Sequence, residues 1–251
     1  MKSVSLLYHD IVEPGQFHAS GFSSPDADIY KLEEREFRRH LEGINRRGVP
    51  ASNRLFTFDD GGASALEPTA TLLEEFGWRG SFFITTDFIG TSGFLTRAEI
   101  RALRARGHVV GSHSCSHPAR MALCSHDQLL HEWGDSRELL SDLLGEAVDS
   151  ASVPGGYYAR RVAEAASECG IRVLFTSEPT SSTHDVAGTE VVGRYSIQQG
   201  VSAETASAIA SGDVMPRLRQ AAFWNAKKAM KKVGGRQWLR LRKYIIARRA
   251  R

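Results

Sequence analysis

The sequence comprises 251 residues, of which 41% are hydrophobic and 24% charged, so it can bury one large core in a single domain. Its three cysteines, Cys115, Cys124 and Cys169, are odd in number and form no CxxC pair. This excludes a disulfide framework and fits a reducing compartment. The first apolar run, residues 4–8, is too short for a secretory signal, and no run reaches transmembrane length, so we expect a cytoplasmic protein.

The formal net charge of +3 conceals an uneven distribution. Residues 216–251 hold 13 Lys or Arg and no Asp or Glu, and subtraction from the totals of 32 and 29 leaves 19 basic and 29 acidic residues in 1–215. The body therefore has a formal charge near −10 and the tail +13. We predict a folded body over 1–215 and a basic amphipathic helical tail over 216–251.

Strand-like and helix-like segments alternate along the body. Capping boxes, which are typical of helix starts, occur at Thr96 with Glu99 and at Ser125 with Gln128. The alternation predicts parallel βα units with functional residues at the carboxyl ends of the strands. The patterns predict strands at 4–8, 55–58, 81–85, 108–111, 151–153, 171–176 and 191–197, helices at 33–47, 66–76, 96–106, 125–144 and 158–169, and a long loop at 11–31.

The sequence LFTFDDGG, residues 55–62, places two adjacent carboxylates at the end of an apolar strand. Consecutive strand side chains point to opposite faces, so Asp59 and Asp60 can serve one cavity only if the strand ends beside them, as the following glycines indicate. Two close carboxylates repel each other. A cation bound to one of them would relieve this repulsion and leave the other free as a base.

The sequence GSHSCSHP, residues 111–118, follows another strand and places His113 and His117 four residues apart. Together with Asp60, these histidines would form a set of two imidazoles and one carboxylate. Such a set leaves coordination positions open for water and substrate, as hydrolytic metal sites require. These ligand types do not rank Zn, Co, Ni and Mn against one another.

TFDDG followed by HSxSHP resembles the first two motifs of the NodB-homology polysaccharide deacetylases, carbohydrate esterase family 4. The similarity extends from LLYHDI at 6–11 to PGGYY at 154–158 and covers about residues 3–200. The resemblance implies an α/β fold, a distorted, incomplete parallel (β/α) barrel, to which this chain adds its basic C-terminal helical extension. It also implies removal of acetyl groups from N-acetylated amino sugars with a divalent metal, commonly zinc.

The expected mechanism combines this resemblance with charge. Asp60, His113 and His117 hold the metal, and Asp59 accepts a proton from water as general base. The resemblance implies that the backbone N–H of Gly155 stabilises the oxyanion.

The sequence departs from the family at two positions. Ser152 stands where the family has an arginine that steadies the base, and the replacement candidates are Arg160, Arg161 and Arg194. The late LxH motif, whose histidine is the family's general acid, is not found in the strand-like segment at 191–197, so His184 and His9 are the candidate acids. We assign His184 as the acid. Predicted substrate-binding residues are His9, Tyr157 and Arg194.

The tail has apolar residues at helical spacing over 216–233, where Leu218, Ala222 and Ala226 share a face, and again over 236–249. The pattern favours attachment to an anionic membrane surface. Packing of the apolar stripe on the acidic barrel remains an alternative. Nucleic-acid binding is not expected, because no recognition motif accompanies the charge.

A membrane location would fit a lipid-linked or growing glycan in surface-polysaccharide assembly as substrate. Two function classes remain open at this stage. One is a metal-dependent amidohydrolase, with a deformylase as a variant. The other is a non-catalytic glycan-binding or scaffolding module, which the missing arginine and acid motivate.

Overall fold

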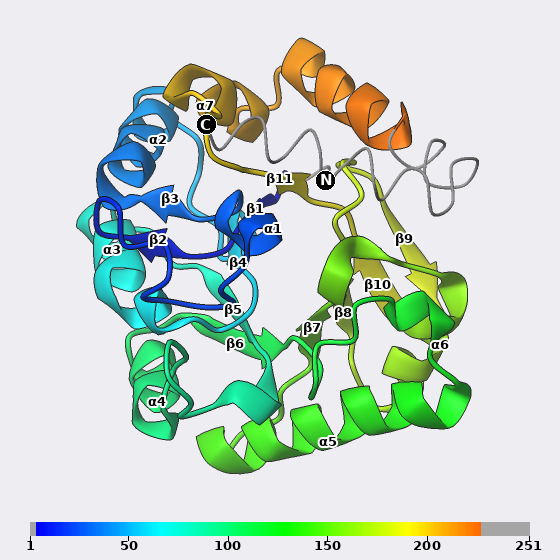
Figure 1. Cartoon of the computed structure of the whole chain (residues 1–251). Helices are drawn as coiled ribbons and strands as arrows, with labels where there is room; N and C mark the ends of the chain where they lie inside the picture. Colours follow the sequence, from blue (N-terminus) through cyan, green and yellow to red (C-terminus); the bar gives the residue numbers. More distant parts are fainter. Residues whose placement is uncertain (1–3, 227–251) are drawn as a thin grey trace.

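A computed structural model describes residues 4–226 of the chain. Nine strands curl into an incomplete barrel in the order β11-β1-β4-β5-β6-β7-β8-β10-β9 (Figure 1). All neighbours are parallel except β10 and β9. The strands are β1 (Leu6–Tyr8), β4 (Phe56–Phe58), β5 (Ser81–Ile84), β6 (Val109–Ser112), β7 (Ser150–Ser152), β8 (Val173–Phe175), β9 (Thr183–Val186), β10 (Thr189–Val192) and β11 (Tyr195–Ser196).

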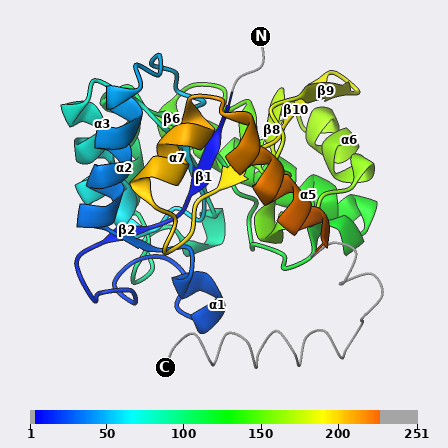
Figure 2. The same ribbon diagram turned by 90° about the horizontal axis from the view of Figure 1, so that it is seen from above.

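Helices cover the outside of the curled sheet (Figures 1 and 2). They are α2 (Glu34–Arg46), α3 (Thr71–Glu75), α4 (Arg97–Ala105), α5 (His126–Leu144), α6 (Arg160–Glu168) and α7 (Ala203–Ala210), followed by a last described helix over 214–226. The two predicted capping boxes are confirmed at the starts of α4 and α5. No helix among residues 4–226 is long and apolar enough to cross a membrane.

The two faces of β4 carry different chemistry, and this difference positions the site. Phe58 packs edge-on against Phe37 of α2 at 5.9 Å between ring centroids, and Tyr8 of β1 packs on both rings. These side chains therefore belong to the core between sheet and helices. Because side chains alternate along a strand, Thr57 and Asp59 point to the opposite, inner face of the barrel. His9, one residue after Tyr8, lies on that inner side for the same reason.

Three predicted segments differ from the structure. The predicted strand 191–197 is divided into β10, which pairs with β8, and β11, which pairs with β1. Residues 193 and 194 connect the two, and a Cβ at Gly193 would lie 2.4 Å from Thr180 Cγ2. The predicted helix 66–76 begins with a wide turn, Leu66–Ala70, in which Glu67 is extended, since a proline disfavours helical geometry in the residue before it. The residues around His184 lie outside every predicted strand, but Thr183–Val186 form the edge strand β9.

The predicted long loop at 11–31 contains short elements. These are β2 (Ile11–Val12), which pairs with β3 (Leu32–Glu33), and α1 (Pro25–Asp28). Lys31 is buried and fixes the loop from inside, because its Nζ donates hydrogen bonds to the carbonyl oxygens of Phe17 and Ser20, at 2.5 and 2.7 Å. The loop is thus held in one conformation beside the carboxyl ends of β1 and β4.

Candidate active site

The strand ends deliver the predicted ligands through unusual backbone geometry. Asp60 follows β4 with φ of +76°, and His117 follows β6 with φ of +57°. Residues with a Cβ rarely adopt this left-handed conformation, and they cluster at functional sites where the surrounding fold enforces it. Because the backbone bends at Asp60, the side chain of Asp59 contacts Arg194 while that of Asp60 contacts His113 and His117.

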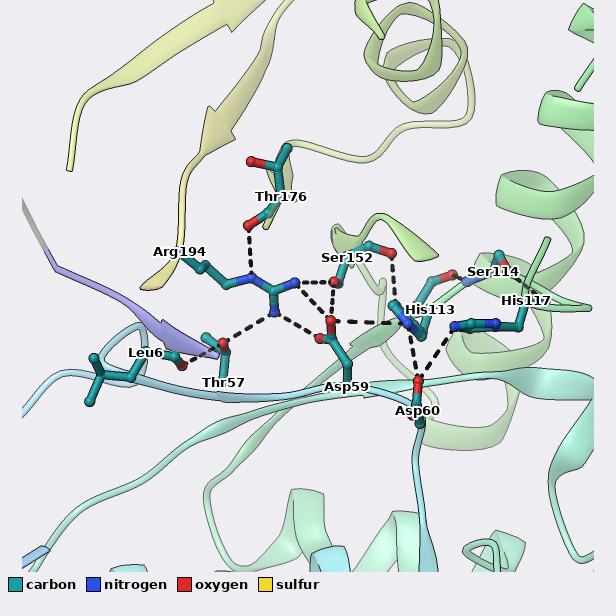
Figure 3. A network of polar contacts seen from close by, with 11 residues as sticks. Leu6, Thr57, Asp59, Asp60, His113, Ser114, His117, Ser152, Thr176 and Arg194 are labelled. Carbon is teal, nitrogen blue, oxygen red and sulfur yellow. Dashed lines mark hydrogen bonds and ion pairs between the residues drawn. The ribbon is translucent and has the colours of Figure 1, made fainter. Parts of the chain in front are cut away.

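Asp60, His113 and His117 converge as the sequence predicts (Figure 3). Asp60 Oδ1 lies 3.4 Å from His113 Nε2 and 3.5 Å from His117 Nε2, and the ligand atoms of all three residues lie within 4.8 Å of one another. Such spacing is what three donors around one small cation require, and the donor set suits a divalent transition metal.

A hydrogen bond orients His113 for this role. Its Nδ1 lies 3.0 Å from the carbonyl oxygen of Ser152 at the end of β7, and the N–H must donate there because a carbonyl can only accept. In its neutral form the ring therefore carries its lone pair on Nε2, the atom that lies 3.4 Å from Asp60 Oδ1, and in its protonated form Nε2 donates to Asp60. This arrangement, in which a backbone carbonyl fixes the tautomer, is common to histidines that bind metals.

Asp59 is held by a buried arginine that comes from the far end of the chain. Arg194 lies in the two-residue connection between β10 and β11, and its side chain is 0% exposed. Its Nη1 lies 2.7 Å from Asp59 Oδ1 and its Nη2 lies 2.8 Å from Asp59 Oδ2 (Figure 3). The pairing is bidentate, the geometry in which a guanidinium binds a carboxylate most strongly.

Every N–H group of Arg194 has an acceptor. Besides Asp59, it donates to Thr57 Oγ1, to Ser152 Oγ at 2.6 Å and to the carbonyl oxygen of Thr176 at 3.1 Å. The Ser152 hydroxyl donates in turn to Asp59 Oδ2 at 2.9 Å. The serine supplies no cation, but it joins the arginine to the carboxylate.

The charges around the two aspartates oppose the effect of burial. Burial alone would raise the pKa of Asp59, but the charges of Arg194 and His113 outweigh it and hold this pKa below its usual value. The pKa of Asp60 is likewise lowered against burial, by a hydrogen bond with His113 and by the neighbouring histidines. Burial and His113 lower the pKa of His117 to about 4, so this ring is neutral near pH 7 and its lone pair is available.

The pKa of His113 moves in the opposite direction. Burial lowers it, but Asp59 and Asp60 outweigh burial and raise it. The two carboxylates therefore create a negative potential where the imidazoles converge. That potential favours a cation.

The two candidate acids occupy different places. His9 is half-buried and directly follows β1. The carbonyl oxygen of its neighbour Tyr8 accepts a hydrogen bond from the Asp59 backbone N–H at 3.1 Å. The charge of His9 also contributes to the lowered pKa of both aspartates. The Nδ1 of His9 is buried and has no hydrogen-bond partner within the described residues. His184 is exposed on β9, 3.5 Å from the Tyr158 hydroxyl. Proximity therefore favours His9 over His184.

The remaining predicted residues lie around the turn after β7. Gly155 is exposed, with φ of +64°, and a Cβ there would lie 2.7 Å from the carbonyl oxygen of Ala119. Tyr157 is half-buried, with Arg120 5.6 Å from its ring centroid. The oxyanion role of Gly155 and the substrate contact of Tyr157 stay predictions.

Among the three candidate arginines, only Arg194 reaches Asp59 within the described structure. Arg160 pairs with Glu164 on the surface, and Arg161 donates to the backbone carbonyls of Ala122 and Cys124. The buried position of Arg194 favours a positioning role over the predicted contact with substrate. The sequence did not predict two further acceptors of Arg194, the Thr57 hydroxyl and the Thr176 carbonyl oxygen, because no motif marks a strand threonine or a backbone carbonyl.

The curled, mostly parallel half-barrel and the Asp-His-His set beside a held carboxylate define an α/β protein with a candidate metal site at the carboxyl ends of its strands. The sequence profile of the polysaccharide deacetylase family matches residues 47–174. The chain belongs to the polysaccharide deacetylase family, as the motifs predict.

Individual relatives agree with this assignment. YxkH of Bacillus subtilis (strain 168), provisionally named a polysaccharide deacetylase, is 25% identical over 215 residues, covering 78% of this chain and 72% of that protein. The structure of IcaB from Ammonifex degensii matches with a TM-score of 0.66 and 18% identity, over 82% of this chain and 96% of that one. Streptococcus pyogenes deacetylase PplD, solved in complex with acetate, matches with a TM-score of 0.64 and 17% identity, over 80% and 95%. The predicted incomplete barrel is therefore confirmed.

Proposed function

We propose that this chain is a divalent-metal-dependent hydrolase that removes the N-acetyl group of an amino sugar. The observation that carries the proposal is the convergence of Asp60, His113 and His117 beside a second carboxylate, Asp59, that is held by other partners. Family membership supports deacetylation as the reaction. When bound by Asp60 and the two histidines, a divalent cation would polarise the amide carbonyl and acidify water.

Asp59 is placed to accept the proton of the attacking water. A carboxylate offers about four acceptor sites, and Arg194 and Ser152 occupy three of them, so one remains. The lowered pKa keeps the group ionised at neutral pH, which a general base requires. The rigid pairing with Arg194 limits its rotation, so the remaining acceptor site has a fixed direction.

The leaving amine needs a proton when the carbon–nitrogen bond breaks. We assign this donation to His9 in place of His184, because His9 directly follows β1, the strand beside β4, and has a buried Nδ1 without a hydrogen-bond partner in the described part. The reaction then balances. Water forms a bond to the amide carbon and loses one proton to Asp59, the carbon–nitrogen bond breaks, the amine leaves with the proton from His9, and the acyl group leaves as acetic acid. Asp59 then releases its proton to solvent and His9 takes one up, so both groups are restored.

The substrate is proposed to be a lipid-linked or growing amino-sugar glycan in surface-polysaccharide biosynthesis, processed in the cytoplasm at the inner membrane face. The sequence feature that supports a location at a membrane surface is the basic tail. We propose zinc as the ion, with cobalt, nickel and manganese as possible substitutes for the same donors.

The test measures bound metal and amine release by the same preparations. Wild type is expected to hold about one divalent ion per chain and to release amine from N-acetylglucosamine oligomers or lipid-linked N-acetyl sugars. Asp59→Asn should retain the metal and lose activity by about 10²- to 10⁴-fold, the range for loss of a general base. Release from N-formyl but not N-acetyl sugars would make the chain a deformylase. A metal-loaded wild type that releases nothing from a broad acyl-sugar panel would favour a glycan-binding module.

The two acid candidates provide a matched pair for the second test. His9→Gln should lower kcat strongly while leaving metal content unchanged. His184→Gln, on the exposed edge strand, should behave like wild type. The reverse result would return the acid role to His184.

A further inference from the structure

The last described helix, residues 214–226, spans the opening of the incomplete barrel (orange in Figure 1). Its Gln220 Nε2 donates to the carbonyl oxygen of Ser196 in the edge strand β11, at 2.7 Å. Its Arg217 Nη1 donates to Ser181 Oγ, two residues before the other edge strand β9, at 3.2 Å. Polar side chains thus attach this helix to both edges of the sheet.

The helix presents its apolar side chains to solvent. At about 100° per residue, Arg217, Gln220, Ala221 and Trp224 share the half-buried side, and the opposite side carries the exposed residues. Within 4–226, the large apolar side chains that are more than half exposed number five, and four of them lie on this helix. These four are Val214, Met215, Leu218 and Phe223, which are 57% to 61% exposed.

This arrangement corrects one alternative for the tail. The alternative in which Leu218, Ala222 and Ala226 pack on the acidic barrel is wrong, because all three residues are exposed. A surface helix of a globular protein normally turns its apolar stripe inward. Here the contacts of Arg217 and Gln220 fix the opposite orientation. Residues 227–251, which hold the rest of the predicted stripe, lie outside the described part.

We propose that the exposed face of helix 214–226 is a docking surface for an anionic lipid bilayer. Charge selects this occupant: residues 216–251 hold 13 Lys or Arg and no acidic residue, and two of these cations, Arg217 and Arg219, lie on the described helix. The other 11 follow directly in the chain. Apolar side chains that enter the headgroup boundary, accompanied by cations that pair with anionic lipid, are the two components of interfacial binding.

Flotation of the full-length chain with phosphatidylglycerol-rich vesicles and with phosphatidylcholine vesicles tests the proposal. The chain is expected to float with the anionic vesicles, less so as salt is raised, and not with the neutral ones. The double variant Met215→Gln/Leu218→Gln keeps every cation, and its partition coefficient should fall about tenfold or more, since two apolar side chains are lost from the interface.

Leu123→Gln is the matched control, because Leu123 is 71% exposed but lies away from the helix in sequence, between β6 and α5. It should float like wild type. The proposal is overturned if the full-length chain stays with the soluble fraction, or if the double variant floats as well as the control. It is also overturned if sedimentation shows self-association that the double variant abolishes, since the face would then bind a second copy of the chain. Circular dichroism of each variant verifies that the fold is intact.

Discussion

Replacing Arg194 by methionine should destabilise the protein strongly. The substitution removes a fully buried guanidinium and leaves Asp59, which is 5% exposed, as a buried carboxylate without its cation. Breaking one half of a buried ion pair typically costs about 3 to 5 kcal/mol. For a protein of this size, that corresponds to a fall in Tm of about 6 to 20 °C.

The double variant Arg194→Met/Asp59→Asn isolates the ion pair from the packing around it. Replacing both charged partners by neutral groups is often close to neutral in stability, so the double variant should regain most of the loss. Denaturant unfolding of wild type, both single variants and the double variant gives the coupling free energy directly. A loss below about 1 kcal/mol in Arg194→Met, or a double variant as unstable as the sum of the singles, would refute the reasoning.

Arg194→Lys separates charge from geometry. Lysine keeps the positive charge but cannot form the bidentate pair that fixes Asp59 Oδ1 and Oδ2. We expect a smaller loss of stability than in the methionine variant, together with a clear fall in kcat at unchanged metal content. Equal kcat in Arg194→Lys and wild type would show that Asp59 does not depend on this arginine for its position.

Three further predictions concern other parts of the site and core. His117→Ala should reduce the amount of bound metal, measured by elemental analysis. It should have little effect on Tm, because the His117 side chain is partly exposed. A metal content equal to that of the Leu123→Gln control would remove His117 from the ligand set. Ser152→Ala removes the hydroxyl that bridges Arg194 and Asp59, and should cost about 1 to 3 kcal/mol in denaturant unfolding; no change would show that the bridge is dispensable. Gly111→Ala should lower the free energy of unfolding by about 1 to 3 kcal/mol, because the added Cβ would lie 2.6 Å from Phe83 Cδ1 and 2.7 Å from the Ser150 carbonyl oxygen. Gly134→Ala is the control: it lies inside α5, its Cβ would have its nearest neighbour at 3.7 Å, and it should be neutral or stabilising.

The ligand set was predictable because its residues are local to two strand ends. Each motif combines an apolar strand, a turn and the metal-binding side chains within a stretch of the chain short enough for the spacing to carry the geometry. The capping boxes were predictable for the same reason, since helix starts depend on neighbours three residues apart. Parallel alternation of strands and helices then indicated where these ends would meet.

The partner of Asp59 could only be narrowed to three candidates. Arg194 is 135 residues away in sequence, and its position depends on the register of β10 against β8 and of β11 against β1. The placement of His9 beside β4 is also a tertiary effect, because the order of strands in the sheet differs from their order in the chain. Local patterns hold no signal for either contact.

Because Arg194 holds Asp59, the orientation of Asp59 depends on the last strands of the barrel, β10 and β11. The candidate metal ligands and both aspartates lie before residue 118, whereas Arg194, which pairs with Asp59, follows β10. During synthesis, the emerging chain would therefore possess its complete ligand set while the base still lacked its partner. Catalytic competence would be acquired late, when the C-terminal strands join the sheet, so hydrolysis would be linked to completion of the fold.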